Sequence, residues 1–169
     1  MVQLIERDVE NGHNLPATDH LELARSFLDD GLNDRALSEI ELLPKSDQFR
    51  SDALIIKLEV FRKNAMWAEM IVSAIHLRSV EPQTARWWVF LAYAVRRTSG
   101  VRLAKQILLS ALASHSNSGD VHYFLACCNC SENDLALARY HASEALRLDP
   151  DLRRPFADDP DLAPLRASS

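Results

Sequence analysis

The chain has 169 residues, of which 47% are hydrophobic and 25% are charged, and its formal net charge is −5 at pH 7. These values suit one compact domain or a short helical array, and they argue against a wholly disordered chain. The negative charge argues against general nucleic-acid binding, which needs a basic surface. No run of about 18 uncharged apolar residues is present, so the sequence predicts no membrane-spanning helix and no membrane partner.

The chain begins with residues 1–16, which show little periodicity and which we expect to form an N-terminal arm. The following segment, 17–50, predicts two helices. The first has apolar residues at three- and four-residue spacing, at Leu21, Ala24, Phe27 and Leu28. Gly31, which takes left-handed dihedral angles at little cost, ends this helix, and Pro44 ends the second one.

The same plan recurs in the segments 51–84, 85–118 and 119–150, whose apolar patterns predict three further helix pairs. The predicted pairs are 51–63 with 66–79, 84–97 with 101–114, and 120–131 with 134–147. Mostly small residues recur in register every 34 residues, at Ala24, Leu58, Ala92 and Ala126 and again at Ala36, Met70, Ala104 and Ala138. A fixed period of this length is typical of a helical-repeat array, and small side chains let the two helices of a pair pack closely.

The last segment, 151–169, does not follow the repeat. A helical array must cover the apolar face of its final repeat. Phe156, Leu162 and Leu165 are suited to this role, so we expect them to fold back onto the fourth pair as a C-terminal cap, followed by a loose tail.

These features resemble the tetratricopeptide-repeat (TPR) family over residues 17–150. The resemblance rests on the 34-residue period, the two columns of small residues, Trp88, Pro82 and Pro150. The closing stretch, Asp-Pro-Asp-Leu-Ala-Pro-Leu-Arg at 159–166, is similar to the last segment of many bacterial members. The sequence departs from the family at Gln48, where a proline is usual, and at Asn129, where an aromatic residue is usual.

The resemblance implies an all-α fold, a right-handed α-solenoid of four antiparallel helix pairs with a short C-terminal cap. It also implies that the first helix of each pair lines a concave groove and that the groove binds a protein or peptide partner. Counting in register then assigns the groove to Arg25, Ile55, Glu59, Arg62, Lys63, Arg86, Val89, Tyr93, Arg96, Arg97, Tyr123 and Cys127. Its middle is basic in an acidic chain, which favours an acidic partner segment with apolar anchors; the same pattern also fits a solvated arginine-rich helix face.

Some members of the family clamp the C-terminal carboxylate of heat-shock chaperones with lysine and asparagine side chains. The corresponding positions here hold Leu21, Arg25, Ile56, Arg86 and Phe90. Apolar side chains cannot hydrogen-bond a carboxylate, so the sequence does not predict this clamp.

The three cysteines, Cys127, Cys128 and Cys130, lie within one predicted helical turn and cannot all point the same way. A structural zinc site needs four ligands, and nothing in the sequence brings His122 or His141 to these thiols. We therefore expect a packing role, with no metal and no cofactor. The absence of a distant cysteine suits the reducing cytoplasm.

No convergent set of acid, base and nucleophile is visible, so the sequence does not predict an enzyme. It predicts a non-catalytic, cytoplasmic, chaperone-like adaptor that binds a peptide or helix in the groove and is monomeric or weakly self-associating. The alternative is a structural subunit or scaffold of a larger assembly that docks through its ends or its convex face. Gel filtration separates the two, because an assembly part self-associates more readily than a ligand-binding adaptor.

Overall fold

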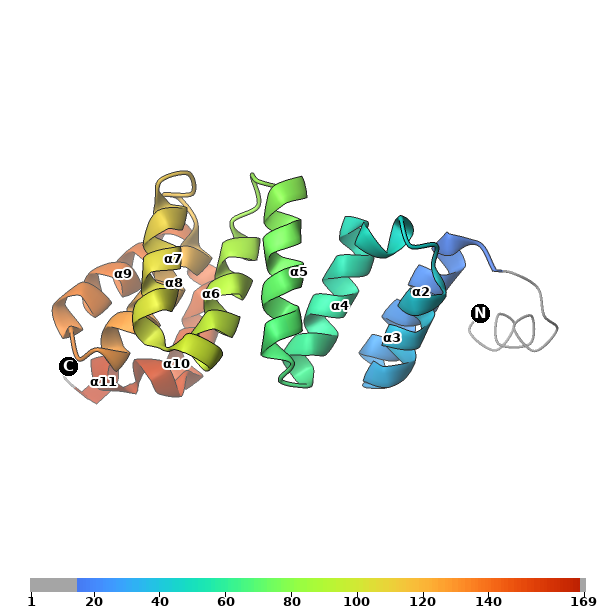
Figure 1. The fold of residues 1–169 in the computed structure, drawn as a ribbon. Coiled ribbons are helices and arrows are strands. Elements are labelled where there is room, and N and C mark those ends of the chain that lie inside the picture. Colours follow the sequence, from blue (N-terminus) through green and yellow to red (C-terminus); the bar gives the residue numbers. More distant parts are fainter. Residues whose placement is uncertain (1–14, 168–169) are drawn as a thin grey trace. The chain divides into compact units, whose positions relative to one another are not determined.

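The computed structural model describes residues 15–167, and within this range the chain forms helices joined by short turns, with no strand (Figure 1). The arm expected at residues 1–16 lies almost entirely outside the described residues. The chain separates into two compact units, residues 1–73 and 74–169, and the division falls inside helix α5 (Trp67–Val80). No helix among the described residues is long and apolar enough to cross a bilayer.

Unit 1 contains the first helix pair and the helix that follows it. Its elements are α2 (Ala17–Asp29), α3 (Asn33–Leu42), the 3-10 turn η1 (Asp47–Phe49), α4 (Ser51–Lys63) and the first half of α5. Its core residues come from α2, α3 and α4 and include Leu23, Phe27, Ile40, Ile56 and Val60. Ala24 and Ala36, from the two small-residue columns, are both fully buried, as the close approach of α2 and α3 requires.

Unit 2 contains the last two helix pairs and the C-terminal segment. The pairs are α6 (Arg86–Ser99) with α7 (Val101–Leu112) and α8 (Gly119–Ser131) with α9 (Leu135–Leu148). Four short elements follow, η2 (Pro150–Leu152), α10 (Arg153–Asp158), η3 (Pro160–Leu162) and α11 (Ala163–Ala167). Ala104, Ala126 and Ala138 of the small-residue columns are buried here, each at most 1% exposed.

The predicted period is visible in the helix bounds. The second helices of the four pairs begin at residues 33, 67, 101 and 135, a constant spacing of 34 residues. The predicted helix 51–63 matches α4 at both ends, whereas α6 begins and ends two residues later than the predicted helix 84–97. The pattern of apolar residues therefore predicted every helix of the repeats, and the errors are confined to helix ends.

The turn inside each pair depends on one residue with a positive φ. Gly31, Ala65 and Asn133 occupy equivalent positions and have φ values of 76°, 56° and 60°. After each of them, the next amide donates to a carbonyl five residues earlier, as in Leu32 N to Phe27 O at 2.7 Å. This hydrogen bond closes the helix and turns the chain. The third pair uses Gly100 instead, with φ of 92°.

The C-terminal segment packs on the last helix pair. Leu162 (0% exposed) and Leu165 (8%) join a core cluster that contains Ala126, Ala138 and other residues of α8 and α9. The ring of Phe156 lies edge-on to that of Tyr123, with the centroids 5.6 Å apart. The three residues that the sequence predicted as a cap therefore do contact the fourth pair.

Candidate functional site

Two of the groove residues predicted in unit 1, Arg62 and Lys63, bind acceptors of the same unit. On α4, Arg62 forms an ion pair with Glu59, one helical turn away, at 3.0 Å. Lys63 donates from Nζ to the backbone carbonyl of Leu28 at 2.8 Å, near the C-terminal end of α2, where a cation is favoured. Ile55 is half-buried and Arg25 is exposed. The two basic residues of α4 predicted to line the groove, Arg62 and Lys63, thus contribute to the local structure of unit 1.

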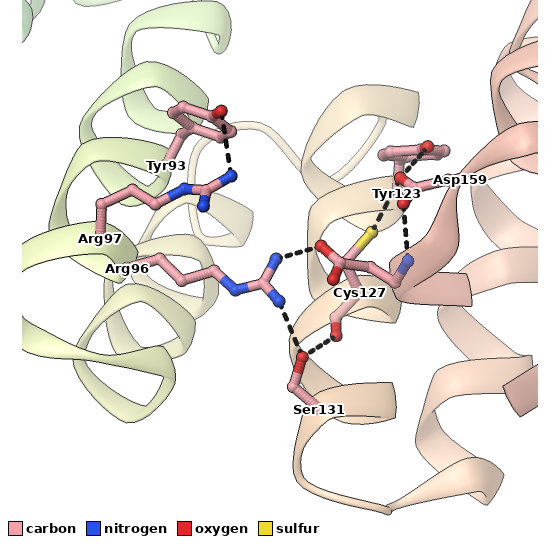
Figure 2. Close-up of polar contacts among 8 residues, drawn as sticks. Tyr93, Arg96, Arg97, Tyr123, Cys127, Ser131 and Asp159 are labelled. Atoms are coloured by element: carbon pink, nitrogen blue, oxygen red, sulfur yellow. Dashed lines mark hydrogen bonds and ion pairs between the residues drawn. The ribbon is translucent and has the colours of Figure 1, made fainter. Parts of the chain in front are cut away.

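Helix α6 carries most of the predicted groove residues of unit 2. The guanidinium group of Arg86 lies 4.9 Å from the ring centroid of Phe90, and that of Arg97 lies 5.2 Å from the ring centroid of Tyr93. Arg97 also donates from Nη2 to the Tyr93 hydroxyl at 3.3 Å (Figure 2). Both pairs have four-residue spacing, which aligns side chains along one side of a helix. Each arginine is therefore ordered by an aromatic neighbour while it stays exposed.

Val89 differs from its neighbours on α6. It is 5% exposed and belongs to the core cluster that joins α6, α7 and α8. Its side chain is therefore part of the packing between the helix pairs of unit 2.

Arg96 connects three elements of unit 2. Its Nη1 donates to Oδ2 of Asp161 in η3 at 2.5 Å, and its Nη2 donates to Oγ of Ser131 in α8 at 2.9 Å (Figure 2). Ser131 in turn donates to the carbonyl of Cys127 at 3.0 Å. The hydrogen bond to Asp161 raises the pKa of Arg96 above its ordinary value. Arg96 therefore holds the C-terminal segment against α6 and α8.

Tyr123 and Cys127 lie beneath the same segment, 8% and 1% exposed. The Tyr123 hydroxyl donates to Oδ2 of Asp159 at 2.5 Å, and the Cys127 thiol lies 3.8 Å from the same oxygen (Figure 2). The other carboxylate oxygen of Asp159 accepts from the amide of Asp161 at 2.8 Å. Burial, and next the hydrogen bond to Asp159, raise the pKa of Tyr123 well above its ordinary value, which keeps the hydroxyl protonated as a donor.

The structure thus brings Arg96, Tyr123 and Cys127 together through Asp159 and Asp161. The sequence analysis named the first three and missed the two carboxylates. A signal for them was present, because the closing segment is itself acidic and carries leucines, which is the chemistry expected of a groove ligand. We call the residues of α6 and α8 in this network, Arg96, Tyr123, Cys127 and Ser131, the arginine–tail site; Asp159 and Asp161 are the carboxylates that bind to it.

The three cysteines are buried and point to different neighbours, as expected from their spacing. Cys127 and Cys130 join the cluster of α8, α9 and the C-terminal segment, and Cys128 joins the cluster of α6, α7 and α8. Burial raises the pKa of Cys127 and Cys130 and raises that of Cys128 to about 11, so the thiols are protonated at neutral pH and are poor nucleophiles. Among residues 15–167, no three His, Cys, Asp or Glu side chains are grouped to hold a metal ion.

Solved structures that resemble this chain are helical-repeat proteins. TTC0263, a thermophilic TPR protein of Thermus thermophilus, is 20% identical with a TM-score of 0.66, over 92% of this chain and 86% of that chain. YrrB, described as a TPR protein with an unusual peptide-binding site, is 16% identical with a TM-score of 0.63, over 86% of this chain and 74% of that chain. MamA of Desulfovibrio magneticus RS-1 is 15% identical with a TM-score of 0.66, over 82% of this chain and 78% of that chain.

At these identities the likeness shows the fold alone. It confirms the predicted fold class, an all-α solenoid of the TPR type. The sequence matches no protein-family model and no curated protein.

Proposed function

We propose that this protein is a non-catalytic adaptor of the cytoplasm whose groove binds an acidic protein segment with apolar anchors. The observation that carries the proposal is the pair of exposed arginines on α6, Arg86 and Arg97, each held against an aromatic ring of the same helix in a chain of net charge −5. The fold supports it, because stacked helix pairs expose extended surfaces to partners. The peptide-binding site for which YrrB is described gives a precedent in a similar structure.

The way in which the arginines are held favours an acidic partner. Arg86 and Arg97 stack on Phe90 and Tyr93, which limits the rotamers of both guanidinium groups while their side chains stay exposed. An ordered guanidinium group forms paired hydrogen bonds to a carboxylate with less loss of entropy. The neighbouring rings offer a broad apolar contact. A segment with carboxylates next to leucine or aromatic residues matches both properties.

Selection from a random peptide library tests this proposal. The full chain and the variant Arg86→Glu/Arg97→Glu are used as parallel targets. We expect the wild-type chain to enrich peptides in which Asp or Glu lies beside large apolar residues. The variant should bind the same peptides about tenfold or more weakly, because like charges then face each other.

A matched control carries the same change of charge elsewhere. Lys45→Glu/Arg102→Glu alters two exposed cations, one in each unit and neither on α6, and should retain the binding of the wild-type chain. Peptides without a preference for acidic residues would contradict the proposal. So would an equal loss of binding in the two double variants, because the effect would then reflect net charge alone.

A second role, as a structural part of a larger assembly, is favoured by exposed apolar side chains on the second helices of unit 2. These are Leu103 and Leu109 on α7 and Leu137 and Tyr140 on α9. Sedimentation velocity tests whether they mediate self-assembly. Association of the wild-type chain that is lost in Leu109→Ser/Leu137→Ser would favour this role, and a monomer at all concentrations would contradict it.

A further inference from the structure

The C-terminal segment has the chemistry that the proposed function assigns to a partner. Residues 159–165 read Asp-Pro-Asp-Leu-Ala-Pro-Leu and so combine two carboxylates with two leucines. Both carboxylates contact side chains of the arginine–tail site, Asp161 at Arg96 and Asp159 at Tyr123. Both leucines are buried against α8 and α9. The chain therefore displays one acidic, leucine-bearing segment already bound to its own helices.

Each contact depends on the spacing within the segment. The Asp159 carboxylate accepts from the amide of Asp161, which fixes the turn at Pro160 and directs the two carboxylates to different partners. Leu162 follows directly and Leu165 one turn later, so both leucines enter the cluster below Tyr123. Arg166 donates to the carbonyls of Phe156 and Asp159, both at 3.0 Å, and closes the segment on itself.

The segment is held mainly by these contacts. Its helices, α10 and α11, have six and five residues, which is too short for a helix that is stable without packing. The Arg96–Asp161 pair is partly exposed, with side-chain exposures of 23% and 41%, so solvent and a competing carboxylate can reach it. Elements of this kind open locally at a lower free energy than the core of a domain. Release of the C-terminal segment uncovers Tyr123 and Cys127. A partner segment that binds in its place must then supply both negative charge and apolar contact.

We propose that residues 159–165 are a resident ligand of the arginine–tail site, and that a partner segment of the pattern Asp-x-Asp-Leu-x-x-Leu binds there by displacing them. This inference rests on the proposed function, and it adds both the sequence pattern of the partner and a regulation of binding. Without a partner, residues 159–165 occupy the arginine–tail site. The site binds a partner segment more tightly when these residues are released.

The test uses the full chain and a fluorescent peptide with the chain's own sequence at 155–167. The variant Asp159→Asn/Asp161→Asn weakens the tail contacts while keeping the shape of both side chains. We expect this variant to bind the peptide about tenfold tighter than the wild-type chain does, measured by fluorescence anisotropy. Adding Arg96→Gln to the double variant should abolish binding, because the peptide then lacks its cationic partner.

The control variant Asp151→Asn/Asp158→Asn removes two exposed carboxylates of the same segment and should bind as the wild-type chain does. Circular dichroism checks that every variant keeps its helices. In the wild-type chain, hydrogen exchange at residues 159–165 should become faster when unlabelled peptide is added, and this readout needs no substitution.

Equal affinity of the wild-type and Asp159→Asn/Asp161→Asn chains, or binding that survives Arg96→Gln, would overturn the inference. Library-selected acidic peptides that bind both chains equally, while the tail peptide binds neither, would overturn it and leave the proposed function intact. If no acidic peptide binds either chain, both proposals fail.

Discussion

The Nδ1 atoms of His122 and His141 lie 3.0 Å apart in the interior of the last helix pair. Nε2 of His122 lies 3.2 Å from the carbonyl oxygen of Ser116, which can only accept, so His122 carries its proton on Nε2. Its Nδ1 is then the acceptor, and His141 donates from Nδ1. This arrangement uses two neutral imidazoles. A proton added to His122 would place two N–H groups opposite each other.

Acid should therefore weaken the fold through this pair. Burial, and next the electrostatic effects of the His122 ring and the Lys105 ammonium group, lower the pKa of His141 from its ordinary 6.5 to about 4. Between these values the unfolded chain binds a proton that the folded chain does not, so the free energy of unfolding falls as the pH drops from about 6.5 to about 4, by about 1–3 kcal/mol. Urea unfolding of the wild-type chain and of His141→Gln, measured across this pH range, isolates the contribution of His141. If the free energy of unfolding changed with pH in the same way for both proteins, the prediction would be contradicted.

Gly119 marks a close contact between the start of α8 and the end of α9. A Cβ at this position would lie 2.8 Å from Cβ of Asp149 and 3.3 Å from the carbonyl oxygen of Ala145. In an open helix a Gly→Ala change stabilises by about 0.5–1 kcal/mol. Here we expect Gly119→Ala to destabilise by about 1–3 kcal/mol, because the backbone must move. Chemical denaturation gives the sign, and a stabilised variant would show that the contact is loose.

Ala65 adopts a left-handed conformation that suits glycine better. Its φ of 56° is the same feature that Gly31 provides in the first pair. We expect Ala65→Gly to stabilise the protein by about 1 kcal/mol, since it removes the steric cost of Cβ. Ala136→Gly, at an exposed position of α9, is the control and should destabilise by about 0.5–1 kcal/mol. Thermal melts that shift in the same direction for both variants would be inconsistent with strain at Ala65.

Asn129 is a fully buried polar residue with an incomplete set of partners. Its amide nitrogen donates to the carbonyl of Leu125 at 2.8 Å, but its side-chain oxygen has no hydrogen-bond partner. We expect Asn129→Leu, which keeps a similar shape, to raise the free energy of unfolding by about 1–2 kcal/mol. Urea denaturation measures the change. A destabilised but folded variant would mean that the amide contributes more than the unpaired oxygen costs.

The repeats could be predicted from the sequence because their determinants are local and periodic. Apolar spacing gave the helices, and the alanines at 36, 104 and 138 marked the close contacts within the pairs. The arginine–tail site could not be found in the same way. Counting in register assigns Tyr123 and Cys127 to a helix face, but it does not show that the non-repeating tail covers that face. The contacts of Asp159 and Asp161 join residues far apart in the sequence and follow no period.

The contribution of the partner's carboxylates to binding can be measured directly. An acidic peptide selected by the wild-type chain is compared with an analogue in which every Asp and Glu is replaced by Asn and Gln, by anisotropy at about 50 and 300 mM salt. We predict that the acidic peptide binds about tenfold or more tightly than the analogue at low salt, and that the difference shrinks at high salt. Equal affinity of the two peptides at low salt would contradict the recognition of an acidic segment by the arginines of α6.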